Sequence, residues 1–156
     1  MVKGEIQIRP ASLTDLAEIQ ELFRETINQV CKRDYSPEQI EVWISAAVDS
    51  RKWEQKISDQ YFIVAEQNNM IIGFASLESG NYLDLLYVHY EHLRKGIASL
   101  LLDQIVKESI NTGHDKIHSN VSITARSFFE SKGFKIRKEN KIMKEGVELI
   151  NYLMSR

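Results

Sequence analysis

Apolar residues recur along the chain with two different spacings, which predict strands alternating with helices. Short alternating or continuous apolar runs predict strands, at residues 6–10, 61–66, 70–77, 82–88, 117–123, 134–140 and 147–154. Apolar positions three and four residues apart predict helices, at residues 12–31, 36–47, 50–58, 96–113 and 124–133. This order predicts an α/β (α+β) fold, a mixed central sheet of about six to seven strands with helices on both faces.

Local start and stop signals support several of these boundaries. Residues 36–39, Ser-Pro-Glu-Gln, place a hydroxyl at a helix N-cap, proline at the first helical position and a glutamine able to bond back. Thr124 is predicted to cap the last short helix, and Gly113 to end the long helix before it. Residues 67–69, Gln-Asn-Asn, predict a hairpin turn between two strands.

Composition narrows the class of protein. The 156 residues, 43% hydrophobic and 27% charged, fit a single globular domain over 1–156. Twenty Lys and Arg against 22 Asp and Glu give a net charge of -2, so nucleic acid is not an expected partner. No apolar run approaches the roughly 20 residues of a membrane span. The single Cys31 excludes an internal disulfide, and we expect a cytoplasmic protein.

The segment 82–98 carries the clearest chemical signal, because a strand ends there, a cationic loop follows and a long helix begins at once. Main-chain N–H groups at a helix start lack internal partners and lie at the positive end of the dipole, so they can bind a phosphate or pyrophosphate. Gly96 allows close approach, Ala98 keeps the first turn small, and Arg94 and Lys95 add positive charge. The alternative is an ordinary connection with solvated cations.

This segment resembles motif A of the GNAT superfamily of N-acetyltransferases, whose pattern is Gln/Arg-x-x-Gly-x-Gly/Ala after a Leu-x-Val strand. Leu86-Tyr87-Val88 matches the strand end, and Gly96 and Ala98 match the two small positions. Leu93 departs from the pattern at the Gln/Arg position. It does not remove the expected mechanism, because the family binds the pyrophosphate mainly through main-chain groups.

The resemblance extends over nearly the whole chain. Residues 6–16 look like the family's opening strand and first helix, and residues 125–134 look like its late helix ending in Gly-Phe. The stretch 34–43, Asp-Tyr-Ser-Pro-Glu-Gln-Ile-Glu-Val-Trp, resembles a bacterial branch of the family. The order and spacing of these pieces strengthen the resemblance beyond any one of them.

The resemblance implies direct transfer of an acetyl group from acetyl-CoA to a primary amine, with no metal. The pantetheine chain would lie beside the third inner strand, bonded by main-chain groups of Leu86 and Val88. A backbone N–H there would polarise the thioester carbonyl. The acceptor, a small molecule or a protein amine, is left open, as is a homodimer. The residues expected to bind acetyl-CoA are Leu86, Tyr87, Val88, Arg94, Lys95, Gly96, Ile97, Ala98 and Ser99.

A general base is expected because the attacking amine must be neutral. Asp84 is the first candidate, placed by period two on the face of Tyr82 and Leu86, although it could be a satisfied structural acceptor instead. Glu78, at the end of the preceding strand, is the second candidate.

The family's usual acid, a tyrosine four residues before the Gly of Gly-Phe, is Phe129 here, and the Asn often found seven residues earlier is Ser122. Tyr87, Tyr152 or water could protonate the leaving thiolate. Phe129 also favours the alternative function, a non-catalytic acyl-CoA-binding regulatory module. A structural α/β protein that binds no CoA is a third interpretation.

Four residues are predicted to line the acceptor pocket: Asp34, Tyr35, Glu78 and Tyr82. For Asp34 and Tyr35, which precede the capped helix, the alternative role is to anchor that helix. His89 and His92 form an H-x-x-H pair in a loop, where a solvated rim is favoured over a zinc site that needs more ligands.

Overall fold

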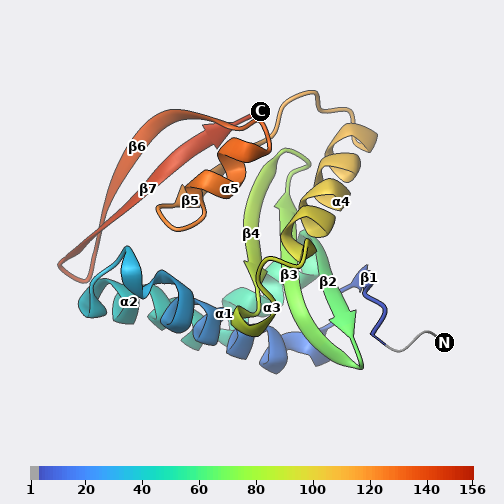
Figure 1. Ribbon diagram of the computed structural model, residues 1–156, viewed down its shortest axis with the longest axis horizontal. Helices are drawn as coiled ribbons and strands as arrows, with labels where there is room; N and C mark the ends of the chain where they lie inside the picture. Colours follow the sequence, from blue (N-terminus) through green and yellow to red (C-terminus); the bar gives the residue numbers. More distant parts are fainter. Residues whose placement is uncertain (1–3) are drawn as a thin grey trace.

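A computed structural model describes residues 4–156, and seven strands form its single mixed sheet (Figure 1). The sheet order is β1-β2-β3-β4-β5-β7-β6. Within the described residues β4 and β5 form the one parallel pair. Residues 1–3 of the predicted domain lie outside the described part. The strands are β1 (Gln7–Pro10), β2 (Tyr61–Gln67), β3 (Met70–Glu78), β4 (Tyr82–Val88), β5 (His118–Ser122), β6 (Lys135–Lys144) and β7 (Val147–Ser155).

Helices cover both faces of the sheet and bury a separate apolar core on each. One core lies between the sheet and the helices α4 and α5, and the other lies beneath α1, α2 and α3. The fold class and the two-sided arrangement predicted from the sequence are confirmed. None of the helices in the described chain is long and apolar enough to cross a bilayer. The helices are α1 (Leu16–Val30), α2 (Pro37–Ile44), α3 (Ser50–Asp59), α4 (Ile97–Asn111) and α5 (Arg126–Ser131).

Local signals predicted the start of α2 and the β2–β3 turn correctly. The Ser36 hydroxyl accepts a bond from the Gln39 N–H, and the Gln39 side chain accepts one from the Ser36 N–H. In the turn, Asn68 and Asn69 both have positive φ, at 52° and 61°. Such a pair suits the right-handed twist of a two-residue hairpin. The predicted strand 134–140 is longer, because β6 pairs with β7 as far as Lys144.

The predicted cap of the last helix is wrong. The helix α5 begins at Arg126, and the Ser122 hydroxyl accepts the bond from the Ala125 N–H. The Thr124 hydroxyl instead donates to the Asp34 carboxylate at 2.8 Å. The loop after β5 therefore bonds to the loop before α2, a tertiary contact that the local sequence does not encode.

Candidate functional site

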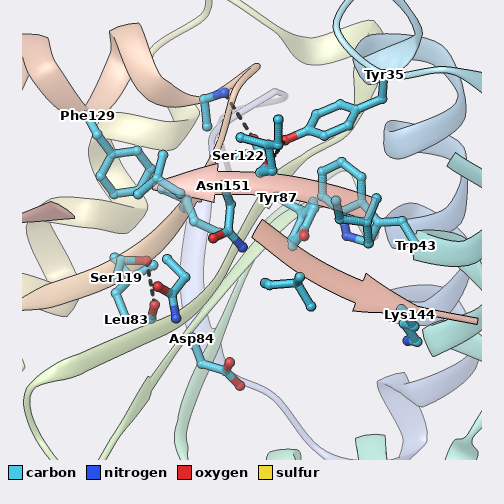
Figure 2. Close-up of a pocket in the computed structure, with 17 residues that line it drawn as sticks. Tyr35, Trp43, Leu83, Asp84, Tyr87, Ser119, Ser122, Phe129, Lys144 and Asn151 are labelled. Atoms are coloured by element: carbon cyan, nitrogen blue, oxygen red, sulfur yellow. Dashed lines mark hydrogen bonds between the residues drawn. The ribbon is translucent and has the colours of Figure 1, made fainter. Parts of the chain in front are cut away.

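The strands β4 and β5 separate soon after they begin, which opens a cleft through the middle of the sheet. They pair only at Tyr82–His118 and Leu83–Ser119. The Ser119 hydroxyl donates a buried bond of 2.7 Å to the Leu83 carbonyl, at the point where the strands part. A cavity of about 310 Å³ lies beyond this bond, lined by both strands and by the β6–β7 hairpin (Figure 2).

The edge of β4 that faces this cleft offers free main-chain groups. The His89 N–H donates to the Ile72 carbonyl, so the alternation of an antiparallel ladder turns the N–H and C=O of Leu86 and Val88 away from β3. The Val88 carbonyl accepts the buried Thr26 hydroxyl at 3.1 Å. Within residues 4–156 the N–H groups of Leu86 and Val88 have no partner. An extended ligand chain could bond there as an added strand.

The first turn of α4, which follows β4 along the chain, presents a second set of free donors. Gly96 is the N-cap residue, with a left-handed φ of 80°, and a Cβ built on it would meet nothing within 4 Å. In the described chain no group accepts from the N–H of Ile97, Ala98 or Ser99. Three amides at the positive end of a 15-residue helix suit a pyrophosphate.

The two predicted cations flank this helix start. Arg94 and Lys95 are both exposed, and Arg94 has a positive φ of 61°. Exposed side chains of this kind can turn toward an anion. The structure thus places the predicted cofactor residues in two successive parts of the chain, at the edge of β4 and at the start of α4.

Asp84 lies at an irregularity in β4. Ser76 faces Leu85 and Leu77 faces Leu83, so one step along β3 corresponds to two along β4 and Asp84 is the extra residue. Such a bulge interrupts the alternation of side chains along a strand.

The predicted common face of Asp84 and Leu86 is therefore wrong. Leu86 packs toward α4, whereas the Asp84 carboxylate accepts bonds from two side chains of the α3 region. Lys56 Nζ lies 2.5 Å and Gln60 Nε2 lies 2.9 Å from Asp84 Oδ2. The carboxylate still lines the cleft and is 14% exposed, so it is partnered but reachable (Figure 2).

Tyr87 points to the side of the sheet that α1–α3 cover, among aromatic rings. Its ring centroid lies 5.0 Å from that of Phe23 and 5.5 Å from that of Phe74. Burial raises the pKa of the Tyr87 hydroxyl well above its ordinary value, so the group stays protonated at neutral pH. Tyr87 also lines the cleft, beside Trp43 (Figure 2). It is thus a hydroxyl donor within the candidate site.

The two positions that depart from the family pattern have structural partners. Phe129 lines the cleft but is only 3% exposed, edge-on to Phe134 at 5.1 Å between ring centroids. The Ser122 hydroxyl is occupied by the Ala125 amide. Phe129 therefore contributes apolar surface, and Ser122 ends β5.

Tyr35 joins three segments that are distant in the sequence. Its hydroxyl donates to the Ile150 carbonyl at 2.7 Å and accepts from the Ile123 N–H at 2.9 Å. Burial raises the pKa of Tyr35 to about 12, so this hydroxyl remains a donor at neutral pH. Tyr35 also lines the cleft, whereas Asp34, bonded to Thr124, does not. Anchoring is the observed role of both, and acceptor binding by Tyr35 stays a prediction.

The other predicted acceptor residues lie off the cleft. Glu78 is exposed at the end of β3, and the Tyr82 hydroxyl accepts a bond from the Asn120 side chain at 3.1 Å. His89 lies 3.4 Å from Glu25, and within residues 4–156 no group of three potential metal ligands forms. Cys31 is buried, and burial raises the pKa of its thiol to about 11.

Several residues of the site carry no recognisable sequence signal. The cleft is lined by Ser119, Asn151 and Lys144, which are on strands. Lys56, on the helix α3, bonds to Asp84. Asn151 and Lys144 belong to the β6–β7 hairpin, which reaches across toward α2 (Figure 1). Polar residues on an edge hairpin look like ordinary solvated positions in a sequence. Only the folded arrangement brings them to the cleft.

Comparison with known proteins places this geometry in context. Residues 31–156 match the family model described as an acetyltransferase (GNAT) domain. The uncharacterized N-acetyltransferase YafP of Escherichia coli K12 is 32% identical over 151 residues, covering 97% of this chain and 95% of that protein. A GCN5-related N-acetyltransferase structure from Rhodopseudomonas palustris has a TM-score of 0.94 at 31% identity, covering 100% of this chain and 98% of that one. The PaiA N-acetyltransferase of Thermoplasma acidophilum, solved with coenzyme A, has a TM-score of 0.81 at 26% identity, covering 97% and 98%.

Proposed function

Since this chain belongs to the GNAT family of acetyltransferases, we propose that it transfers an acetyl group from acetyl-CoA to a primary amine. The amine nitrogen attacks the thioester carbonyl carbon, a C–N bond forms and the C–S bond breaks. The amine loses one proton as the base accepts it, and the departing thiolate takes up a proton to become the CoA thiol. Acetyl-CoA is the cosubstrate, and no metal takes part in the proposed step.

The observation that carries this proposal is the pair of N–H sets, one on the edge of β4 and one at the start of α4, that have no partner within residues 4–156. The N–H groups of Leu86 and Val88 suit the pantetheine amides and the thioester carbonyl, and those of residues 97–99 suit the pyrophosphate. The coenzyme A present in the PaiA structure agrees with a ligand of this class.

Two side chains of the cleft supply the acid and base in this proposal. Asp84 accepts the proton that the amine nitrogen loses as the C–N bond forms, directly or through one water, and its bond to Lys56 Nζ fixes its orientation. Tyr87 is the proposed donor to the thiolate, because its hydroxyl remains protonated while Phe129 has no proton to give. Water is the alternative donor, and Tyr152, which the sequence also offered, lies outside the cleft lining.

The test has two parts. Acetyl-CoA should raise the melting temperature, because a ligand at 100 times its dissociation constant stabilises the fold by about 2.7 kcal/mol. Thiol release with a panel of amines should then depend on the amine. No thermal shift at millimolar acetyl-CoA contradicts the proposal. A shift without thiol release for any amine supports the regulatory module instead.

The compartment and the partners stay predictions. We propose a cytoplasmic enzyme on the strength of its single, buried cysteine. Fractionation of cells that express a tagged chain tests the compartment, and sedimentation at micromolar concentration tests the homodimer.

A further inference from the structure

A second cavity, of about 420 Å³, lies on the α1–α3 side of the sheet. Trp43, Tyr87 and Lys144 line both this cavity and the β4–β5 cleft, so the two spaces meet at these residues. The Lys56–Asp84 ion pair joins them as well, because Asp84 lines the cleft and Lys56 lines the second cavity. A molecule in the second cavity is therefore close to an acetyl group in the cleft.

The wall of the second cavity is aromatic and apolar. Phe23, Trp53 and Leu85 form its inner side together with Tyr87. Phe23 and Trp53 pack edge to face, with ring centroids 5.0 Å apart. The Trp53 N–H donates to the Ala46 carbonyl at 2.9 Å, which leaves the ring surface apolar. A wall of this kind suits an apolar side chain.

The charged groups of the second cavity are equal in number once the paired Lys56 is set aside, two lysines and two carboxylates. Lys52, Lys56 and Lys144 line it against two carboxylates, Asp49 and Glu145. Asp49 Oδ1 accepts the Lys52 N–H as the N-cap of α3. Lys56 is paired with Asp84, but within residues 4–156 neither Lys52 nor Lys144 forms an ion pair.

We infer that the second cavity binds the acceptor, and that this acceptor carries a carboxylate beside its amine, as an apolar amino acid does. Lys52 and Lys144 bind the carboxylate, and the aromatic wall holds the side chain. The amine then points to Tyr87 and Asp84, where the two cavities meet. The inference rests on the proposed acetyl transfer.

Matched acceptors test the carboxylate directly. Leucine and 3-methylbutylamine differ only in that group, as do phenylalanine and phenethylamine. In the thiol-release assay with acetyl-CoA we expect kcat/KM to be roughly ten- to a hundredfold higher for each amino acid, the range of one charge-assisted contact. Lys52→Gln and Lys144→Gln should each reduce this ratio. Lys107→Gln, on the exposed side of α4, is the matched control and should leave the ratio unchanged.

Binding can be read separately, because both tryptophans of the chain line the second cavity. Trp43→Phe leaves Trp53 as the single emitter. Leucine added in the presence of CoA should change its emission saturably, and Lys144→Gln should weaken that binding. The wild-type protein gives the same readout with both emitters if Trp43→Phe does not fold.

The outcomes separate the two proposals. Equal or faster acetylation of 3-methylbutylamine or spermidine overturns the carboxylate inference and leaves acetyl transfer standing. An unchanged tryptophan emission while leucine is acetylated overturns the location of the acceptor. Failure of every amine to release CoA contradicts both the inference and the proposed function.

Discussion

Asp84 faces α3 rather than the neighbours of Leu86 because one extra residue in β4 breaks the alternation of its side chains. The same extra residue brings the carboxylate to the edge of the cleft, where Lys56 and Gln60 bond to it. A carboxylate in that place is oriented by its two partners and is still reachable. These properties are the ones that the proposed base needs.

Asp84→Asn should lower kcat for acetyl transfer by roughly a hundredfold, the lower range for loss of a general base. The dissociation constant of acetyl-CoA, measured by calorimetry, should change little, because the main-chain donors of β4 and α4 are untouched. Glu54→Gln, an exposed change on α3, serves as the control. An undiminished kcat in Asp84→Asn, with a loss in Glu78→Gln, would transfer the role of base to Glu78.

Tyr35→Phe tests the anchoring hydroxyl. Its removal leaves the Ile123 N–H and the Ile150 carbonyl without their partner, and we expect a loss of about 1–3 kcal/mol in the free energy of unfolding. Urea denaturation measures the loss. The control is Tyr90→Phe, since among the hydrogen bonds of residues 4–156 the Tyr90 hydroxyl joins no main-chain group. Equal stabilities of the two variants would contradict the anchoring role.

At the residue scale the sequence identified which functional groups line the site better than it identified the direction in which their side chains point. Asp84 and Tyr87 could be named because a carboxylate and a hydroxyl interrupt an apolar strand. The bulge that redirects Asp84 depends on how β3 and β4 pair, and no local pattern contains that register. The two bonds of Tyr35 likewise depend on β5 and β7, which lie about a hundred positions further along the chain.

At the scale of elements, α4 carries a glycine with positive φ near each end. Gly96 precedes its first turn and Gly113 follows its last, with φ of 80° and 92°, and a Cβ on either would meet nothing within 4 Å. Only Gly96 lies beside the free N–H groups proposed to bind the pyrophosphate.

Gly96→Leu and Gly113→Leu should therefore destabilise the fold to a similar extent, by about 1–2 kcal/mol for a left-handed residue with a side chain. Gly96→Leu alone should weaken acetyl-CoA binding, by roughly tenfold or more, because its side chain covers the donors. Calorimetry and urea denaturation separate the two effects. Equal acetyl-CoA affinity in both variants would place the pyrophosphate elsewhere.

A charged cluster ties β1 to β2 and to the start of α1. The Arg9 guanidinium bonds both oxygens of Asp15, at 2.9 and 3.0 Å, and also Glu66 at 2.9 Å. The bond to Arg9, more than any other contact, lowers the pKa of the Asp15 carboxyl below its ordinary value.

The pH dependence of stability follows from this shift. A lowered pKa in the folded state contributes stability above the unfolded value of about 3.9, and this contribution is lost as the pH falls through the folded value. The free energy of unfolding of the wild type should thus fall more steeply below about pH 4 than that of Asp15→Asn. Parallel curves from urea titrations at a series of pH values would contradict the linkage.

The elements themselves were predictable where the signals are local. The capping residues 36–39 fix the start of α2, and the asparagines of the β2–β3 turn fix its conformation. Thr124 was assigned the wrong role because Ser122 competes for the same cap, and the contact of Thr124 with Asp34 comes from another part of the chain. Local chemistry therefore determines the start of α2 and the β2–β3 turn, whereas a tertiary contact determines the role of Thr124.

At the scale of the molecule, the parting of β4 and β5 connects the two faces of the sheet. Helices bury a core on each face, and the cleft with its neighbouring cavity passes between these cores. The cofactor donors lie along β4 and α4, and the lysines of the second cavity come from α3 and the β6–β7 hairpin. The sequence could predict the first set from one contiguous segment, but it could not predict the second, which two distant segments assemble.

The bond between Ser119 and Leu83 lies where β4 and β5 part, so under the proposed function it should limit the length of the acyl chain that fits between the strands. In a thioester with a longer acyl chain, such as butyryl-CoA, the end of that chain would meet the paired part of β4 and β5. Turnover should fall as the acyl chain lengthens, and Ser119→Ala should relax this limit by freeing the strands to separate further. Kinetics with acetyl-, propionyl- and butyryl-CoA measure the acyl chain length at which turnover is lost.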